Sequence, residues 1–217
     1  MDGNRRWARA HGLSEADGHA AGLEAIRPIV ERALERGVAV LSLYAFSREN
    51  WGRSEDEVRA LMGLLGAAVR DETPELAAQG VRVRLLGRLE ELPEETRVAV
   101  DEALLLTAAG ERLTLGVAFN YSGRSELVDA ARRCVADGLG VDRIDEAAVA
   151  NRLYTAGLPD PDLLIRTGGD QRISNFLIWQ AAYAELHFSD RLWPDFDGAA
   201  FDDALADYAR RSRRFGR

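Results

Sequence analysis

Cysteine is almost absent from the 217 residues: Cys134 is the only one, so no disulfide can form within the chain. It falls in an expected helix, where a buried and unreactive thiol is the common arrangement. No apolar run approaches the ~20 residues that cross a bilayer, and the charged first residues do not resemble a secretory signal. Together these absences predict a cytoplasmic protein.

Positive charge is in deficit, because 28 Lys and Arg residues face 36 Asp and Glu residues, for a formal net charge of −8. A general nucleic-acid-binding protein needs a basic face, so nucleic acid is not an expected partner. An anionic small ligand remains compatible, because local clusters set the local potential. Arginines gather in three short segments, at 5–6, 48–53 and 166–172.

Low-complexity segments, linkers and repeats are also missing, and the length suits one domain over residues 1–217. Patterns typical of strands alternate with amphipathic patterns typical of helices, which predicts an α/β fold with a mainly parallel sheet. Strands are expected at 38–46, 81–87, 112–121, 162–167 and 184–188. Helices are expected at 17–37, 54–72, 92–110, 125–138, 145–157 and 201–216. Ser54 and Glu57 have the spacing of a capping box.

Loops of one chemistry follow three of these strands: SRENWGR, NYSGR and GGDQRIS, and the opening MDGNRR has the same character. Ligands of parallel sheets bind at the carboxyl ends of the strands. Backbone amides at helix starts, together with guanidinium groups, bind phosphate oxygens. Each loop alone could be an ordinary turn, but four of them at one sheet edge indicate a phosphate site.

Arg166 ends an apolar strand, where an unpaired charge is costly. Two glycines, Arg172 and Ser174 follow it, a set suited to a diphosphate; the alternative is a structural ion pair near Asp170. Asp2 is the lone acid among the donors of the opening loop. Because Mg²⁺ is held by one or two carboxylates plus substrate phosphates, Asp2 is a candidate metal ligand, with Glu185 as the candidate second carboxylate.

At this point the chain resembles the cis-prenyltransferases of the undecaprenyl diphosphate synthase type, over essentially its whole length. The motifs are DGNRRWA, SLYAFSRENWGRSEDEV, FNYSGRSELVDA and DPDLLIRTGGDQRISNFLIWQAAYAELHFSDRLWPDF. The Asp-rich DDxxD motifs of the all-helical trans-prenyltransferases do not occur. The resemblance implies condensation of isopentenyl diphosphate with an allylic diphosphate to form a cis double bond, with Mg²⁺ as cofactor. It also implies a six-stranded parallel sheet wrapped by helices, a hydrophobic tunnel, a homodimer, and peripheral membrane association for a lipid product.

The same resemblance assigns roles by matching motifs. Asp2 would hold Mg²⁺ and assist departure of the allylic diphosphate, with Glu185 contributing to the metal site. The allylic diphosphate would be bound by Gly3, Asn4, Arg5, Arg6, Trp7 and His19. Isopentenyl diphosphate would be bound by Arg166, Arg172 and Ser174. The segment that closes over the substrates would include Ser47, Asn50, Trp51, Arg53 and Glu57, with Asn50 assisting the catalytic loss of a proton. Arg214, Phe215 and Gly216 match a terminal element that reaches the partner's active site.

Two departures from the family pattern stand out. Members commonly carry an arginine four residues before the histidine of the first helix, and Glu15 stands there in this chain. An acid at that position should weaken the grip on the allylic diphosphate or mark a different allylic substrate. Members also carry an apolar strand directly before MDGN, so we expect such a strand upstream of Met1.

Product length is left open between two hypotheses. Small residues at Ala45, Gly63, Gly66, Ala67 and Ala68 leave volume for a medium or long polyprenyl diphosphate, a lipid-carrier precursor. The same glycines could equally serve close helix–sheet packing. The alternative hypothesis is a short-chain or branched product of secondary metabolism, with Glu15 as its mark. A non-catalytic scaffold subunit is disfavoured by the intact Asp2, Arg166 and Arg172.

Overall fold

The strands of the computed structural model, which describes residues 1–211, form two parallel sheets. The first has the order β1-β3-β2 and the second pairs β4 with β5. Their bounds are β1 (Val40–Ser47), β2 (Val81–Leu86), β3 (Leu113–Tyr121), β4 (Leu163–Arg166) and β5 (Glu185–Phe188). The predicted α/β fold and parallel pairing are confirmed. The prediction of a single six-stranded sheet is wrong for residues 1–211, which form one three-stranded and one two-stranded sheet.

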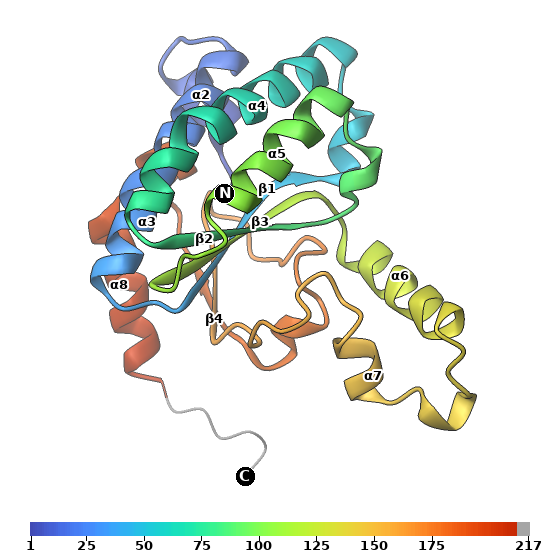
Figure 1. Cartoon of the computed structure of the whole chain (residues 1–217). Helices are drawn as coiled ribbons and strands as arrows, with labels where there is room; N and C mark the ends of the chain where they lie inside the picture. Colours follow the sequence, from blue (N-terminus) through green and yellow to red (C-terminus); the bar gives the residue numbers. More distant parts are fainter. Residues whose placement is uncertain (212–217) are drawn as a thin grey trace.

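One face of the three-stranded sheet packs against the segment around Leu177 and Ala181, and its other face and its surroundings hold the helices (Figure 1). They are α1 (Asn4–Ala10), α2 (Glu15–Glu24), α3 (Ile26–Glu35), α4 (Glu55–Ala78), α5 (Glu94–Leu106), α6 (Gly123–Ala136), α7 (Glu146–Ala150) and α8 (Gly198–Ala209). Short 3₁₀ turns are η1 (Arg48–Gly52), η2 (Leu89–Glu91), η3 (Val141–Arg143), η4 (Gln180–Tyr183) and η5 (Trp193–Asp195). In Figure 1, α4 and α5 run side by side over the sheet, and α6 with α7 projects from the body.

The core follows the two-residue period of the strands. Leu115 and Phe119 of β3 point towards α3, α4 and α5, whereas Ala118 points to the opposite face and contacts the layer around Leu177. An irregularity in β1 at Phe46 places that ring on the same side as Ala45. Each buried side chain of this kind contributes about 1.5–3 kcal/mol to stability.

Several helix boundaries differ from the sequence prediction. The expected helix 17–37 divides at Ala25 into α2 and α3, because Pro28 has no amide hydrogen to donate to the carbonyl of Glu24 four residues earlier. The helix expected at 54–72 continues to Ala78, whereas the one expected at 145–157 lasts only from Glu146 to Ala150. Only half of the predicted capping box forms: the amide of Glu57 donates to Ser54 Oγ, but the Glu57 carboxylate turns elsewhere.

A cavity of about 880 Å³ separates the two sheets. Its walls include residues 38–47 along β1 and residues 162–167 along β4, so the outer edges of both sheets line it. Within residues 1–211 no strand pairs with either edge on this side. Met1 lies at the cavity, and burial lowers the pKa of its amino group from 8.0 to about 6.

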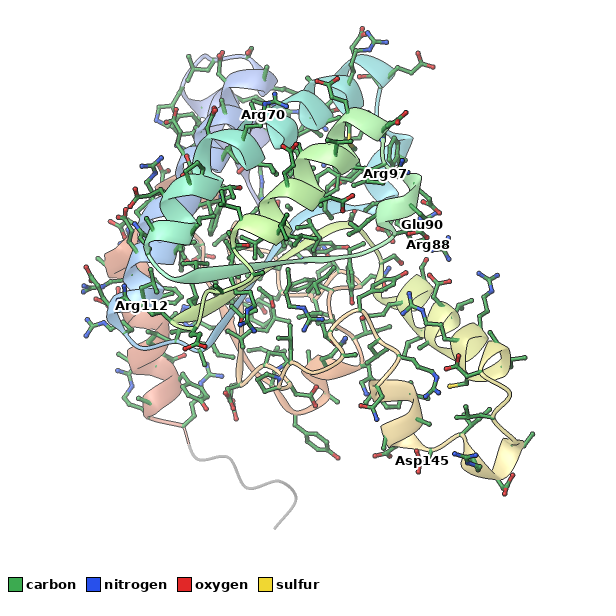
Figure 2. All side chains as sticks on the ribbon, in the orientation of Figure 1. Arg70, Arg88, Glu90, Arg97, Arg112 and Asp145 are labelled. Carbon is green, nitrogen blue, oxygen red and sulfur yellow. The ribbon has the colours of Figure 1, made fainter. Side chains whose placement is uncertain are left out.

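The parallel arrangement gives each sheet one carboxyl edge. Figure 2 shows Arg88, which follows β2, and Arg112, which precedes β3, on opposite sides of the molecule. The loops after β1, β2 and β3 therefore leave the sheet on the Arg88 side. Phosphate-binding residues were predicted in two of these loops.

Candidate active site

The opening loop is bound to the end of β4 through backbone contacts of Asp2. The Asp2 amide donates to Thr167 Oγ1 at 2.9 Å, and the amide of Trp193 donates to the Asp2 carbonyl at 2.9 Å. The Thr167 hydroxyl also donates to that carbonyl, at 3.0 Å. Thr167 is buried and was not among the predicted residues; its position directly after Arg166 in the strand was the available signal. These contacts hold the Asp2 carboxylate at the carboxyl end of the sheet.

Gly3 makes the turn that follows, and α1 begins immediately after it at Asn4. Its φ of +114° lies in the left-handed region, and a Cβ there would come within 2.8 Å of the Leu192 side chain. We expect Gly3→Ala to destabilise the chain by about 1–3 kcal/mol through backbone strain and this clash. Chemical denaturation measures this loss. Gly12→Ala is the control, because Gly12 also has positive φ (+69°) but nothing lies within 4 Å of its added Cβ; an equal loss in both variants would contradict the packing role of Gly3.

Arg166 is the most buried of the site arginines, with 12% of its side chain exposed. Its Nη2 donates to Asp2 Oδ2 at 2.9 Å and to Asp170 Oδ2 at 3.1 Å, and its Nη1 donates to Ser174 Oγ at 2.5 Å. Arg172 donates to both oxygens of Asp170, at 3.1 and 2.6 Å. The structure therefore contains both the clustered arginines of a diphosphate site and the ion pair with Asp170 that was the alternative.

The Asp2 carboxylate lies between two arginines. Besides Arg166, Arg6 Nη2 approaches Asp2 Oδ1 at 3.3 Å, while Arg6 Nη1 donates to the carbonyl of Gly168 at 2.6 Å. Burial acts to raise the pKa of Asp2, but the hydrogen bond and charge of Arg166, helped by Arg6, lower it overall. Asp2 is thus an ionised carboxylate held among donors.

The start of α1 packs against α2. Its first residue, Asn4, lies against Gly22, where an added Cβ would come within 2.5 Å of the Asn4 amide nitrogen, and Asn4 Oδ1 is buried without a protein partner. The next residue, Arg5, lies 2.8 Å from Glu15 at the start of α2. Arg5 and Arg6 were predicted in a loop, but both belong to the first turn of α1.

His19 connects α2 to the first turn of α4. Its Nε2 lies 3.3 Å from Glu57 Oε1, and Arg53 Nη1 donates to the same oxygen at 2.7 Å. Burial is the main cause that lowers the pKa of His19, and the charges of Arg53 and Arg5 act in the same direction. The contact explains why Glu57 does not complete the capping box.

The segment after β1 is hydrogen-bonded to two other loops. Trp51 Nε1 donates to Asn120 Oδ1 at 2.8 Å, and Asn175 Nδ2 donates to Glu49 Oε1 at 2.9 Å. Asn175 also donates to Ser122 Oγ at 2.8 Å, which joins the loops after β3 and β4. The predicted convergence of loops at one edge is therefore confirmed.

Within that segment, Asn50 has a structural contact. Its Oδ1 accepts from the amide of Ser47 at 3.0 Å in a capping box at the start of η1. Sequence reasoning missed Asn120 and Asn175, whose positive φ values of 49° and 63° mark tight turns. For Asn120 the available signal was an asparagine after the apolar run LTLGVAF, since asparagine tolerates that backbone region; Asn175, nine residues after the end of β4, had no such signal.

Most of the predicted residues line the cavity described above. They are Asp2, Gly3, Asn4, Arg5, Arg6, His19, Ser47, Asn50, Arg53, Arg166, Arg172 and Ser174. Ala45 and Leu61 line it as well, but Gly63, Gly66, Ala67 and Ala68 do not. A Cβ added to Gly63 would meet no atom within 4 Å, and one added to Gly66 would meet only Arg70. The two glycines therefore neither line this cavity nor permit close helix–sheet packing.

Two tryptophans and a carboxylate lie apart from this lining. Trp7 donates from Nε1 to Asp195 Oδ1 at 2.7 Å, and Trp51 is bound to Asn120. Glu185 is the first residue of β5 and pairs with Leu163 of β4. Arg166 lies three residues, or about 10 Å, further along β4, so Glu185 is at the opposite end of this sheet from Arg166. It forms an ion pair with Arg211 at 3.0 Å, so a single chain does not bring Glu185 to Asp2. Arg214 and Gly216 lie outside the described residues.

Residues 1–211 lack two features, a clustered metal-binding group and a membrane-spanning helix. No three His, Cys, Asp or Glu side chains in this range gather as a metal-binding group. Over the same range, no helix combines the length and apolar character needed to cross a membrane.

The family model for putative undecaprenyl diphosphate synthases matches residues 1–216. The chain is 48% identical over 220 residues to an isoprenyl transferase of Agrobacterium fabrum, covering 100% of this chain and 89% of the relative. It is 49% identical over 220 residues to a trans,polycis-polyprenyl diphosphate synthase of Thermobifida fusca described as (2Z,6E)-farnesyl diphosphate specific, covering 100% and 78%.

Solved structures agree with this similarity. Lavandulyl diphosphate synthase of Lavandula x intermedia, in complex with dimethylallyl diphosphate, superposes with a TM-score of 0.97 at 37% identity, covering 100% of this chain and 95% of that one. A probable undecaprenyl diphosphate synthase of Campylobacter jejuni superposes with a TM-score of 0.83 at 30% identity, covering 91% and 93%.

Proposed function

Because this chain belongs to the undecaprenyl diphosphate synthase family of prenyltransferases, we propose that it condenses isopentenyl diphosphate with an allylic diphosphate to form a cis-polyprenyl diphosphate. The observation that carries the proposal is the position of Asp2, whose carboxylate joins Arg6 of the opening motif to Arg166 at the end of β4. Two groups of phosphate-binding side chains thus meet at one carboxylate.

The two groups divide the substrates between them. Arg5, Arg6 and His19, with the amides at the start of α1, bind the allylic diphosphate. Arg166, Arg172 and Ser174 bind isopentenyl diphosphate. The carbon–oxygen bond of the allylic diphosphate breaks, the double bond of isopentenyl diphosphate forms the new carbon–carbon bond, and a proton leaves the product. Arginines and amides stabilise the charge that develops on the departing diphosphate.

Mg²⁺ is the proposed cofactor, and the oxygen donors at Asp2 suit it. One protein carboxylate completed by substrate phosphate oxygens is a common arrangement for this ion. Asp2 would hold it, and the ion would neutralise negative charge on the leaving diphosphate. Glu185 stays a proposed second contributor only if a partner subunit supplies it, given its position at the far end of β5.

The segment around Asn50 and Trp51 would close over the substrates and exclude water from the allylic cation. We further propose a homodimer in the cytoplasm that contacts membranes peripherally through its lipid product. All 217 residues would belong to one catalytic domain, and the cavity between β1 and β4 would accommodate a further apolar strand. The open edges of those two strands support this last proposal.

A shorter product is the second candidate. The backbone superposition with a lavandulyl diphosphate synthase favours it, as does the apolar packing of Phe46, Met62 and Phe119 between β1, α4 and β3. Identities of 46–49% to isoprenyl transferases and a polyprenyl diphosphate synthase favour the longer product.

One assay tests the function and separates the two candidates. The protein is incubated with labelled isopentenyl diphosphate, Mg²⁺, and dimethylallyl, geranyl or farnesyl diphosphate in turn, and the products are sized. A ladder of products beyond fifteen carbons is expected. A ceiling at fifteen carbons would select the shorter product, and no product with any of the three primers would refute the proposed function.

A further inference from the structure

Glu15 forms ion pairs with two arginines of the cavity wall. Its Oε2 lies 2.8 Å from Arg5 Nε, and its Oε1 accepts from Arg9 Nη2 at 2.9 Å. Arg5 and Arg9 both line the cavity, whereas Glu15 is not part of that lining. The carboxylate therefore contacts the two guanidinium groups from outside the cavity lining.

Arg5 belongs to the allylic diphosphate group of the proposed site. Its charge acts on both His19 and Glu57, contributing to the lowered pKa of each, which places all three in one electrostatic neighbourhood. Two arginines facing a diphosphate would present two positive charges. Together with Glu15 the two arginines carry a net charge of +1, so their attraction for an anion is reduced.

We infer that Glu15 is an affinity-tuning residue, which lowers the affinity of the site for the allylic diphosphate by partly neutralising Arg5 and Arg9. This inference rests on the proposed function and deepens it. Glu15 acts through the arginines and does not touch the reacting atoms. The site would then depend more on burial of the primer's hydrocarbon chain for its affinity.

The test is Glu15→Gln, which removes the charge and keeps the size and one hydrogen-bonding oxygen. The Glu15 side chain is 38% exposed, so its replacement leaves no buried cavity. The substitution also leaves the Ser14–Asp17 capping box at the start of α2 intact, so we expect the variant to fold. The probe is farnesyl thiodiphosphate, an analogue that does not ionise, with binding measured by calorimetry. Glu24→Gln, an exposed position at the other end of α2, is the matched control for one lost negative charge.

We expect E15Q to bind the analogue about tenfold more tightly than the wild type at low salt, because a diphosphate carries at least two charges close to the removed one. The ratio of the two affinities should fall towards one at 1 M salt, where the Debye length is about 3 Å. The KM for the allylic primer should fall in parallel, while kcat and the KM for isopentenyl diphosphate stay near wild type. E24Q should behave as wild type in every measurement.

Unchanged affinity of E15Q for the analogue, or an increase in affinity that high salt does not reduce, would overturn the inference. The proposed function would still stand as long as the wild-type protein turns over its substrates. Equal tightening in E24Q would also overturn the inference, by showing a general effect of net charge. Absence of turnover in the wild type would instead refute the proposed function itself. The two failures are therefore distinguishable.

Discussion

Replacing Asp2 with alanine is expected to lower turnover by about a thousandfold while the protein stays folded. The substitution removes the carboxylate that joins Arg6 to Arg166, and with it the proposed ligand of Mg²⁺. The position of the loop depends on backbone contacts with Thr167 and Trp193, which alanine retains. Arg166 keeps Asp170 and Ser174 as partners, so no buried charge is stranded.

Incorporation of labelled isopentenyl diphosphate, with thermal unfolding in parallel, measures both parts of this expectation. Asp2→Asn separates charge from shape, because asparagine keeps the size of the side chain; we expect it to be nearly as inactive as alanine. The matched control is Asp101→Asn, an exposed aspartate of α5 that is not part of the cavity lining. Near-normal turnover in Asp2→Ala would refute the metal role.

The second large effect concerns the cavity between the sheets. We expect that fusing a six-residue apolar strand ahead of Met1 raises the thermal unfolding midpoint by roughly 10 °C and increases turnover. Such a strand would find unpaired backbone groups on both β1 and β4 and would bury its side chains in the cavity of about 880 Å³. The added strand would also restrain the Asp2 loop at its N-terminal end, in addition to the existing contacts of Asp2 with Thr167 and Trp193.

A fusion of six glycine and serine residues is the control, because it has the same length without the apolar side chains. A second readout is the pH dependence of stability. The Met1 amino group has its pKa lowered to about 6 in the folded chain, so the unfused protein should lose stability as pH falls from about 8 towards 6. The apolar fusion replaces that group by a peptide bond and should remove this dependence. An equal rise in midpoint with the glycine–serine fusion would contradict the proposed strand.

Sequence patterns were sufficient for features that depend on local chemistry. Apolar runs followed by asparagine, glycine and arginine marked the carboxyl ends of parallel strands, and the loops at Asn120 and Asn175 do meet the segment after β1. The opening loop was expected to meet these loops as well, and Asp2 does contact Arg166 at the end of β4, although that ion pair itself was not predicted.

Other features depend on register and on long-range contacts, which a sequence does not display. Glu185 was expected beside Asp2, but the pairing of β4 with β5 places it at the far end of its strand. Glu57 has the spacing of a capping box, yet His19 and Arg53 compete successfully for its carboxylate. Gly63 lies on the face of α4 that points away from the cavity, which its position in the sequence does not reveal.

The carboxylates that accompany the site arginines have a consequence for the entropy of binding. The described pairs are Arg5–Glu15, Arg6–Asp2, Arg53–Glu57, Arg166–Asp2 and Arg172–Asp170. Long side chains lose about 1–2 kcal/mol of rotamer freedom when they are ordered. Here much of that ordering accompanies folding, because each guanidinium is already held before a substrate arrives. A diphosphate then binds guanidinium groups that are already paired with carboxylates, so the site gives up some attraction and gains a cation framework that is preorganised.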